Sequence, residues 1–141
     1  MAASSATRWE PWIPMPKTSF FVYFSGSATV ADAGRRLARS LSVVEDGDLL
    51  RVRWRDAANP EFTIGLRTGH DVAGAAAEIG HRHRIKEFTA FDRRFEVSID
   101  DLDVALDEVN TLIEVQLGLQ DLTNGYLVLP WNGSVQAPDP G

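Results

Sequence analysis

Several arginines in this sequence could bind an anionic ligand. They lie in two segments, residues 50–55 and 61–67, in which apolar and polar residues alternate. Alternation places every second side chain on the same face of a β-sheet. Guanidinium groups pair with phosphate and aromatic rings stack on bases, so this face could bind an anionic ligand or nucleic acid. The simpler interpretation, a solvated strand face, is favoured because the net charge is −6. The candidate ligand-binding residues are Arg51, Arg53, Arg55, Arg67 and Tyr23.

Two histidines, His81 and His83, flank Arg82, and Glu78 lies one helical turn earlier. Imidazole and carboxylate groups bind zinc or iron, but a site needs a third or fourth ligand in the right place. Basic residues at the end of a helix also stabilise its negative pole without any metal. The chain has no cysteine, which excludes thiolate ligands and disulfides. We therefore predict no metal and no other cofactor, with the two histidines as weak candidates only.

Acidic residues cluster at 100–107, where Asp100, Asp101, Asp103 and Asp107 could be read as acid/base groups or magnesium ligands. Their place in the first turns of a predicted helix favours a structural role, because carboxylates there complement the helix dipole. Neither a phosphate-loop spacing nor a nucleophile-elbow spacing occurs. Catalysis is therefore the third-ranked function.

A long helix is predicted over residues 100–122, and its pattern is unusual. Gln116 and Gln120 fall near the centre of its apolar stripe, and a buried amide needs a hydrogen-bonding partner. Val104 and Val115 belong to a second apolar stripe on the other side, so the helix is either enclosed in the domain or covered by a partner. The predicted core-facing residues are Leu102, Ala105, Leu106, Val109, Leu112, Ile113, Leu117 and Leu119. The predicted interface residues, with tryptophans as possible anchors, are Gln116, Gln120, Val104, Val115, Trp9, Trp12 and Trp131.

The elements that position these residues follow the order β-α-β-β-α-β-α-β. The first six match the split βαβ pattern of a ferredoxin-like sandwich, which makes the fold class α+β with an added C-terminal helix and strand. Asn132 and Gly133 predict a turn after the last strand. The predicted elements are a strand at 20–24, a helix at 30–41 capped by Ser27 or Thr29, strands at 50–55 and 61–67, a helix at about 70–80, a strand at 95–99, a helix at 100–122 and a strand at 126–129. The predicted domain organisation is an extended arm at 1–18, one α+β domain at 19–135 and a disordered tail at 136–141.

The 141 residues are 44% hydrophobic and 24% charged, which is typical of a single globular domain. We expect a bacterial, cytoplasmic protein, because neither a secretory signal nor an apolar stretch of membrane-spanning length is present. The acidic charge makes nucleic acid an improbable partner. The leading hypothesis is a non-enzymatic interaction domain, such as an immunity-type or antitoxin-type inhibitor or an adaptor, that binds a basic protein or forms a homodimer. The alternative is an anion-binding module that uses the arginine face.

Overall fold

The structure is a computed structural model that describes residues 19–54, 60–107 and 109–138. The predicted arm at 1–18, with Trp9 and Trp12, and the candidate Arg55 lie outside the described residues. The elements in chain order are β2 (Ser19–Phe24), α1 (Val30–Leu37), β3 (Ser42–Asp46), β4 (Leu49–Arg53), β5 (Glu61–Thr68), α2 (His70–His83), the 3₁₀ helix η2 (Lys86–Ala90), β6 (Arg93–Ile99), α3 (Leu102–Asp107), α4 (Val109–Thr123), β7 (Tyr126–Leu129) and β8 (Ser134–Gln136).

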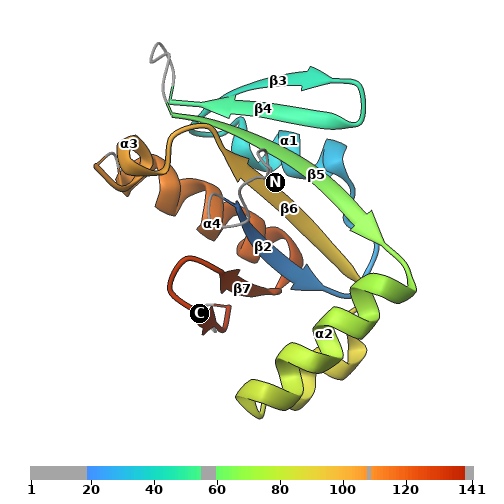
Figure 1. Ribbon diagram of the computed structural model, residues 1–141. Helices are drawn as coiled ribbons and strands as arrows, with labels where there is room; N and C mark the ends of the chain where they lie inside the picture. The colour runs from blue at the N-terminus through green and yellow to red at the C-terminus, as the bar shows by residue number, and fades with distance from the viewer. Residues whose placement is uncertain (1–18, 55–59, 108, 139–141) are drawn as a thin grey trace, which may run out of the picture.

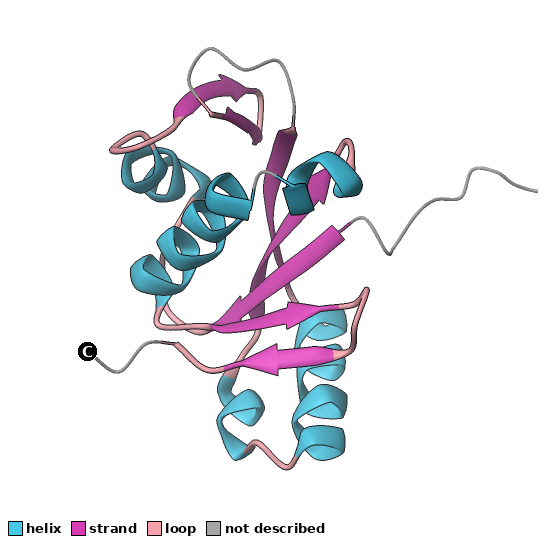
Figure 2. Ribbon diagram, turned by 90° about the vertical axis from the view of Figure 1, so that its left-hand side faces the viewer, coloured by secondary structure: helices cyan, strands magenta, loops and turns pink. Residues whose placement is uncertain are grey.

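The described strands form one seven-stranded antiparallel sheet in the order β3-β4-β5-β6-β2-β7-β8. Helices α1 and α4 lie against one face, and α2 and η2 lie against part of the other face near one end of the sheet (Figures 1 and 2). The α+β class is therefore confirmed. Within the described ranges, no helix combines the length and the apolar character needed to cross a membrane.

The main core lies between the sheet and the α1/α4 layer. In β2 the alternating side chains Phe20, Val22 and Phe24 point into it and are at most 1% exposed. The rings of Phe24 and Phe95, on the paired strands β2 and β6, stack with centroids 5.1 Å apart. Aromatic pairs at this separation add to the stability that burial gives. The core therefore connects strands that are far apart in the sequence.

Helix α1 begins where the sequence predicted, because Thr29 forms a capping box with Asp32. The Thr29 hydroxyl accepts from the Asp32 N–H at 3.2 Å, and the Asp32 carboxylate accepts from the Thr29 N–H at 2.9 Å. This exchange satisfies two of the N–H groups that a helix start leaves free. The helix ends at Leu37, earlier than predicted, and its C-terminal part contacts α4.

The predicted ferredoxin-like arrangement of the first six elements is not confirmed by the strand order. It requires the strand at 61–67 beside the first strand, but β6 lies between β5 and β2. The predicted second helix, α2, packs on the sheet face opposite to α1. The structure also contains β3, a strand that the sequence pattern did not predict. The Gly47 turn, with φ +62°, joins β3 to β4.

The end of the chain forms the predicted turn. Asn132 and Gly133 lie in the loop between β7 and β8, where the Gly133 N–H donates to the Leu129 carbonyl at 2.9 Å. Gly133 has a φ of +72°, which suits glycine. Gln136, assigned to the disordered tail, is the last residue of β8 and lies opposite Leu127. Strand β8 therefore includes residue 136.

Replacing Phe95 by alanine tests the importance of the stacked pair in the core. We expect Phe95→Ala to lower the free energy of unfolding by about 3–5 kcal/mol, because it leaves a cavity against Phe24. Urea unfolding followed by circular dichroism measures the change. Val44→Ala, at a side chain that is 51% exposed, should change it by less than about 0.5 kcal/mol. Equal effects of the two variants would contradict the position of this core.

Candidate functional site

The described arginines of the predicted face lie on one side of the sheet. The register places Arg51 opposite Thr63 and Arg53 opposite Glu61, and Arg67 follows on the same side of β5. Their neighbours in the strands are buried in the main core, so these three arginines point away from α1 and α4. The period-two pattern was therefore sufficient to place them together.

The three arginines are paired with carboxylates of the same chain. Both members of each pair are partly or largely exposed, so each pair contributes little to stability. An anionic ligand would nevertheless have to compete with these carboxylates for the guanidinium groups. The pairs are Arg51 with Asp46 at 2.9 Å, Arg53 with Glu61 at 3.8 Å and Arg67 with Asp71 at 2.9 Å. The face is therefore balanced in charge.

Tyr23 lies on the arginine side of the sheet, but α2 and η2 cover it. Its side chain is 2% exposed and its hydroxyl accepts from Arg94 Nη1 at 2.7 Å. Glu96 holds the same guanidinium through Nε at 2.8 Å, and Arg94 lies 4.8 Å from the centre of the Phe21 ring. Burial raises the pKa of the Tyr23 phenol, while the Arg94 charge acts in the opposite direction. The alternation of β6 could have predicted Arg94 and Glu96 on this face, but sequence reasoning missed both.

The two histidines lie in the last turn of α2, and both are exposed. Nearby Glu78 is within 3.9 Å of Arg82. Within the part of the chain that the structure describes, no group of three or more histidine, aspartate or glutamate side chains is arranged to hold a metal ion. This segment instead forms a basic helix end.

Helices α3 and α4 expose a row of large apolar side chains. Leu106 is 47% exposed, Val109 44%, Ile113 41% and Leu117 51%. The last three are four residues apart and therefore follow one side of α4. We call these four residues the α3–α4 face. The prediction that these four side chains point into the core is wrong. The same prediction is confirmed for Ala105, Leu112 and Leu119, which are buried in the main core beside Val115.

Helix α4 packs closely against α1. A Cβ atom on Gly118 would lie 2.7 Å from Leu37 Cδ2, so any larger residue would require the Leu37 side chain to shift. Thr111 and Val115, on the same side of the helix as Gly118, are therefore buried at 3% and 0% exposure. This small-residue side was the sequence signal that could have identified the inward face.

The predicted interface residues are divided between the interior and the surface. Val115 is buried in the main core, and Val104 and Gln116 are partly exposed. Gln120 is 4% exposed, and its Nε2 donates to the carbonyls of Gly125 and Gln136, each at 3.1 Å. This amide therefore connects α4 to the C-terminal hairpin. Trp131 packs edge-on against Phe20, with ring centroids 6.2 Å apart.

Carboxylates border the α3–α4 face. Asp103, Asp107 and Glu114 are exposed, and within the described ranges no cationic side chain lies at ion-pairing distance from them. Asp121 is the exception, because Arg36 of α1 donates to it at 3.1 Å. An apolar row beside carboxylates suits a protein surface that offers apolar and basic groups.

The buried amide of Gln120 gives a testable contribution to stability. Gln120→Leu leaves two carbonyl groups without their donor, so we expect the free energy of unfolding to fall by about 1–3 kcal/mol. Gln116→Leu, four residues earlier and partly exposed, should change it by less than about 0.5 kcal/mol. Urea unfolding of both variants measures the difference. A stable Gln120→Leu protein would show that the amide does not hold the hairpin.

Tyr23 gives a prediction of pH dependence. Its folded-state pKa is raised by burial, whereas a tyrosine in the unfolded chain titrates near about 10. The folded state then retains the proton at higher pH, and stability declines as the pH rises from about 10 toward the folded-state pKa. Urea unfolding across this range should show a smaller decline for Tyr23→Phe than for the wild type. Tyr126→Phe, which removes the other tyrosine, should leave the decline intact. The same decline in all three proteins would contradict the assignment.

Comparison with known proteins gives no relative. No protein-family model matches this chain, and no curated protein or solved structure matches it at a significant level.

Proposed function

We propose that this chain is a non-enzymatic interaction domain that binds a basic protein through the α3–α4 face, as a small inhibitor or adaptor of the immunity or antitoxin type would. The observation that carries the proposal is the exposed row Leu106, Val109, Ile113 and Leu117 beside carboxylates that form no ion pair with any described residue. A contiguous apolar patch bordered by polar groups is typical of a binding surface.

The apolar row supplies binding energy. Full burial of a leucine, isoleucine or valine side chain contributes about 1.5–3 kcal/mol, and these four side chains are each roughly half exposed. Covering all four would contribute roughly 3–6 kcal/mol before the cost of ordering the partner. This contribution is enough to support a specific complex when polar contacts around it are also satisfied.

The distribution of charge along the sequence favours one sign of charge on the partner. Residues 95–141 contain nine aspartates and glutamates and no lysine, arginine or histidine, which is a formal charge of −9. Residues 1–94 contain all 14 lysines and arginines and 11 acidic residues, which is +3, so the two parts sum to −6. Opposite potentials accelerate encounter and exclude like-charged partners. A basic partner is therefore favoured at the C-terminal part of the chain.

A second candidate function is anion binding on the arginine face, supported by the placement of Arg51, Arg53 and Arg67 on one side of the sheet. Their carboxylate partners count against it, because a ligand must displace them. We therefore rank it below protein binding.

The proposal also includes a specific topology of the fold and a cellular compartment. The chain passes through β2, α1, β5, β6, α4 and β7, and these strands lie in the spatial order β7-β2-β6-β5. This order supports an elaborated split βαβ sandwich in which α4, not α2, is the second helix and the β3–β4 hairpin and α2–η2 are insertions. A cytoplasmic location fits a cysteine-free chain.

The test introduces two positive charges into the apolar row of the α3–α4 face. The face variant, Ile113→Lys with Leu117→Lys, should lose a stoichiometric partner that the tagged wild-type protein captures from its host, because it removes apolar area and introduces repulsion. The partner, identified by mass spectrometry and purified, should be basic and should bind about 100-fold more weakly to the face variant, which corresponds to about 2.7 kcal/mol. Binding to the wild type should weaken as salt rises.

The matched control is Val44→Lys with Leu49→Lys on the β3–β4 hairpin, where the side chains are 51% and 43% exposed. This hairpin control should keep the partner. Loss of binding in the hairpin control alone would transfer the site to the arginine side of the sheet. Urea unfolding of both variants shows whether either loss is a loss of folding.

A further inference from the structure

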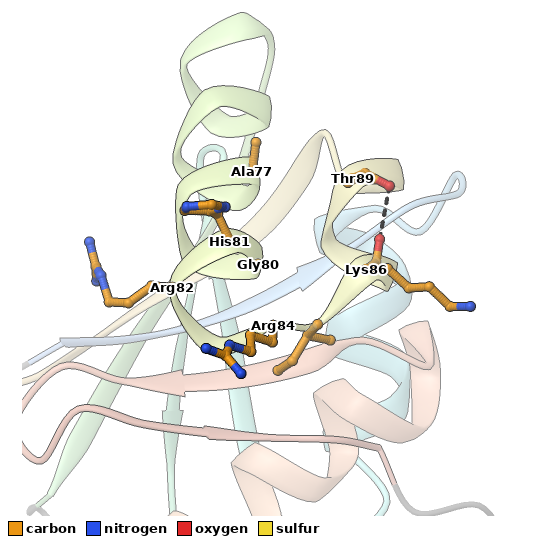
Figure 3. A pocket seen from close by; sticks show the side chains of 8 residues that line it. Ala77, Gly80, His81, Arg82, Arg84, Lys86 and Thr89 are labelled. Carbon is orange, nitrogen blue, oxygen red and sulfur yellow. Dashed lines mark hydrogen bonds between the residues drawn. The ribbon is translucent and has the colours of Figure 1, made fainter.

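The turn between α2 and η2 forms an open groove of about 700 Å³ on the surface. Ala77, Gly80 and Ile85 contribute apolar lining, and Arg82, Arg84 and Lys86 contribute cations. In Figure 3, Arg82 and Lys86 extend to opposite sides, and Arg84 lies at the turn that joins the two helices. This combination of an apolar floor and a basic rim is complementary to the α3–α4 face.

The groove depends on a close contact between the two helices. A Cβ atom on Gly80 would lie 2.6 Å from Phe88 Cβ and 2.8 Å from the Ile85 carbonyl oxygen. Glycine at this position therefore lets η2 fold back along α2. Phe88 is fully buried against the sheet, and the Thr89 hydroxyl donates to the Lys86 carbonyl at 2.8 Å (Figure 3). These contacts fix the walls of the groove.

Arg84 occupies a backbone position at which glycine is usual. It follows the end of α2 with φ 58° and ψ 44°, in the left-handed region. The Ile85 N–H donates to the Gly80 carbonyl at 2.8 Å and the Arg84 N–H to the His81 carbonyl at 3.4 Å, which is the Schellman pattern. A side chain at this position is strained, and strain of this kind is found where a side chain has a function.

The cations of the groove are available to a ligand. Arg84 and Lys86 are exposed, and within the described ranges neither has a carboxylate at ion-pairing distance. Arg82 is 3.9 Å from Glu78, but their side chains are 64% and 74% exposed, so this pair is weak. Glu87 is also exposed beside Lys86. The occupant must therefore present anionic groups together with apolar side chains.

We propose that this groove binds the α3–α4 face of a second copy of the chain, head to tail. The face is a convex helical row with Asp107 and Glu114 beside Ile113 and Leu117, and helix-in-groove binding uses this shape. The inference rests on the proposed function, because it names one occupant of the same face. The groove and the face lie on different elements, so two bound copies still have one free groove and one free face. Further copies can therefore add, and the assembly is either an open filament or a closed ring. A basic partner competes for the face and releases the copies.

Arg84→Gly separates binding from folding. Glycine relieves the left-handed strain, so the midpoint of urea unfolding should rise. The same variant loses the guanidinium, so sedimentation at low salt should show self-association about tenfold weaker than in the wild type, or about 1.4 kcal/mol. Wild-type protein that stays monomeric at low salt over the whole accessible concentration range would overturn the proposal. An Arg84→Gly protein that associates as strongly as the wild type would also overturn it.

Mixing two variants tests the head-to-tail geometry. The face variant keeps its groove, and a groove variant, Arg82→Glu with Lys86→Glu, keeps its face. Each should be monomeric alone, whereas an equimolar mixture should form a dimer of one copy each and nothing larger. A groove variant that still dimerises alone would show face-to-face pairing and overturn the proposal, as would a mixture without the mixed dimer.

The same variants distinguish this inference from the proposed function. The groove variant should still bind the purified basic partner, because its α3–α4 face is unchanged. If the wild type binds the partner through the face and yet never self-associates, the second-copy proposal fails and the proposed function stands. If the copies associate through groove and face but no basic partner binds the face, the proposed function fails and the groove assignment stands.

Discussion

Strand β2 is the element on which the rest of this structure depends, because it is apolar on both sides and two separate cores meet in it. Phe20, Val22 and Phe24 contribute to the core under α1 and α4, while Phe21 and Tyr23 contribute to the core under α2 and η2. A strand of this kind must be paired on both edges and covered on both faces. The central place of β2 between β6 and β7, and the presence of helices on both faces, follow from this one requirement.

Helices α2 and η2 cover only part of their face of the sheet, and this determines which polar side chains remain exposed. Helices α2 and η2 cover the sheet near Tyr23, but they leave Arg51, Thr63 and Ser98 on a solvated face. The exposed apolar area is instead concentrated on α3 and α4, behind the fully covered face. Arg51, Arg53 and Arg67 are paired with nearby carboxylates. Asp103, Asp107 and Glu114 have no cationic partner in the part of the chain that the structure describes.

Local patterns were sufficient for the elements whose environment is simple. Alternation in β4, β5 and β6, the cap at Thr29 and the Asn132–Gly133 turn are determined within a few residues, and each is present. The orientation of α4 was not accessible in this way, because both of its sides are apolar and periodicity cannot choose between them. In the structure, the side of α4 that carries Gly118 lies against Leu37 of α1. The place of β6 beside β2 depends on pairing between Phe24 and Arg93, which no local window contains.

The pairing of β2 also determines when the sheet can form. Its partners are β6, whose paired residues come 69 to 79 residues later, and β7, whose paired residues come 103 to 107 residues later. During synthesis the aromatic segment Phe20–Phe24 leaves the ribosome long before either partner, and it is the kind of segment that pairs with other chains when left exposed. The meander from β3 to β5 can form in the meantime, because its contacts are local. We therefore expect the pairing of β2 to form late in folding, and the aggregation risk of the nascent chain to lie in the strand that is central once folding is complete.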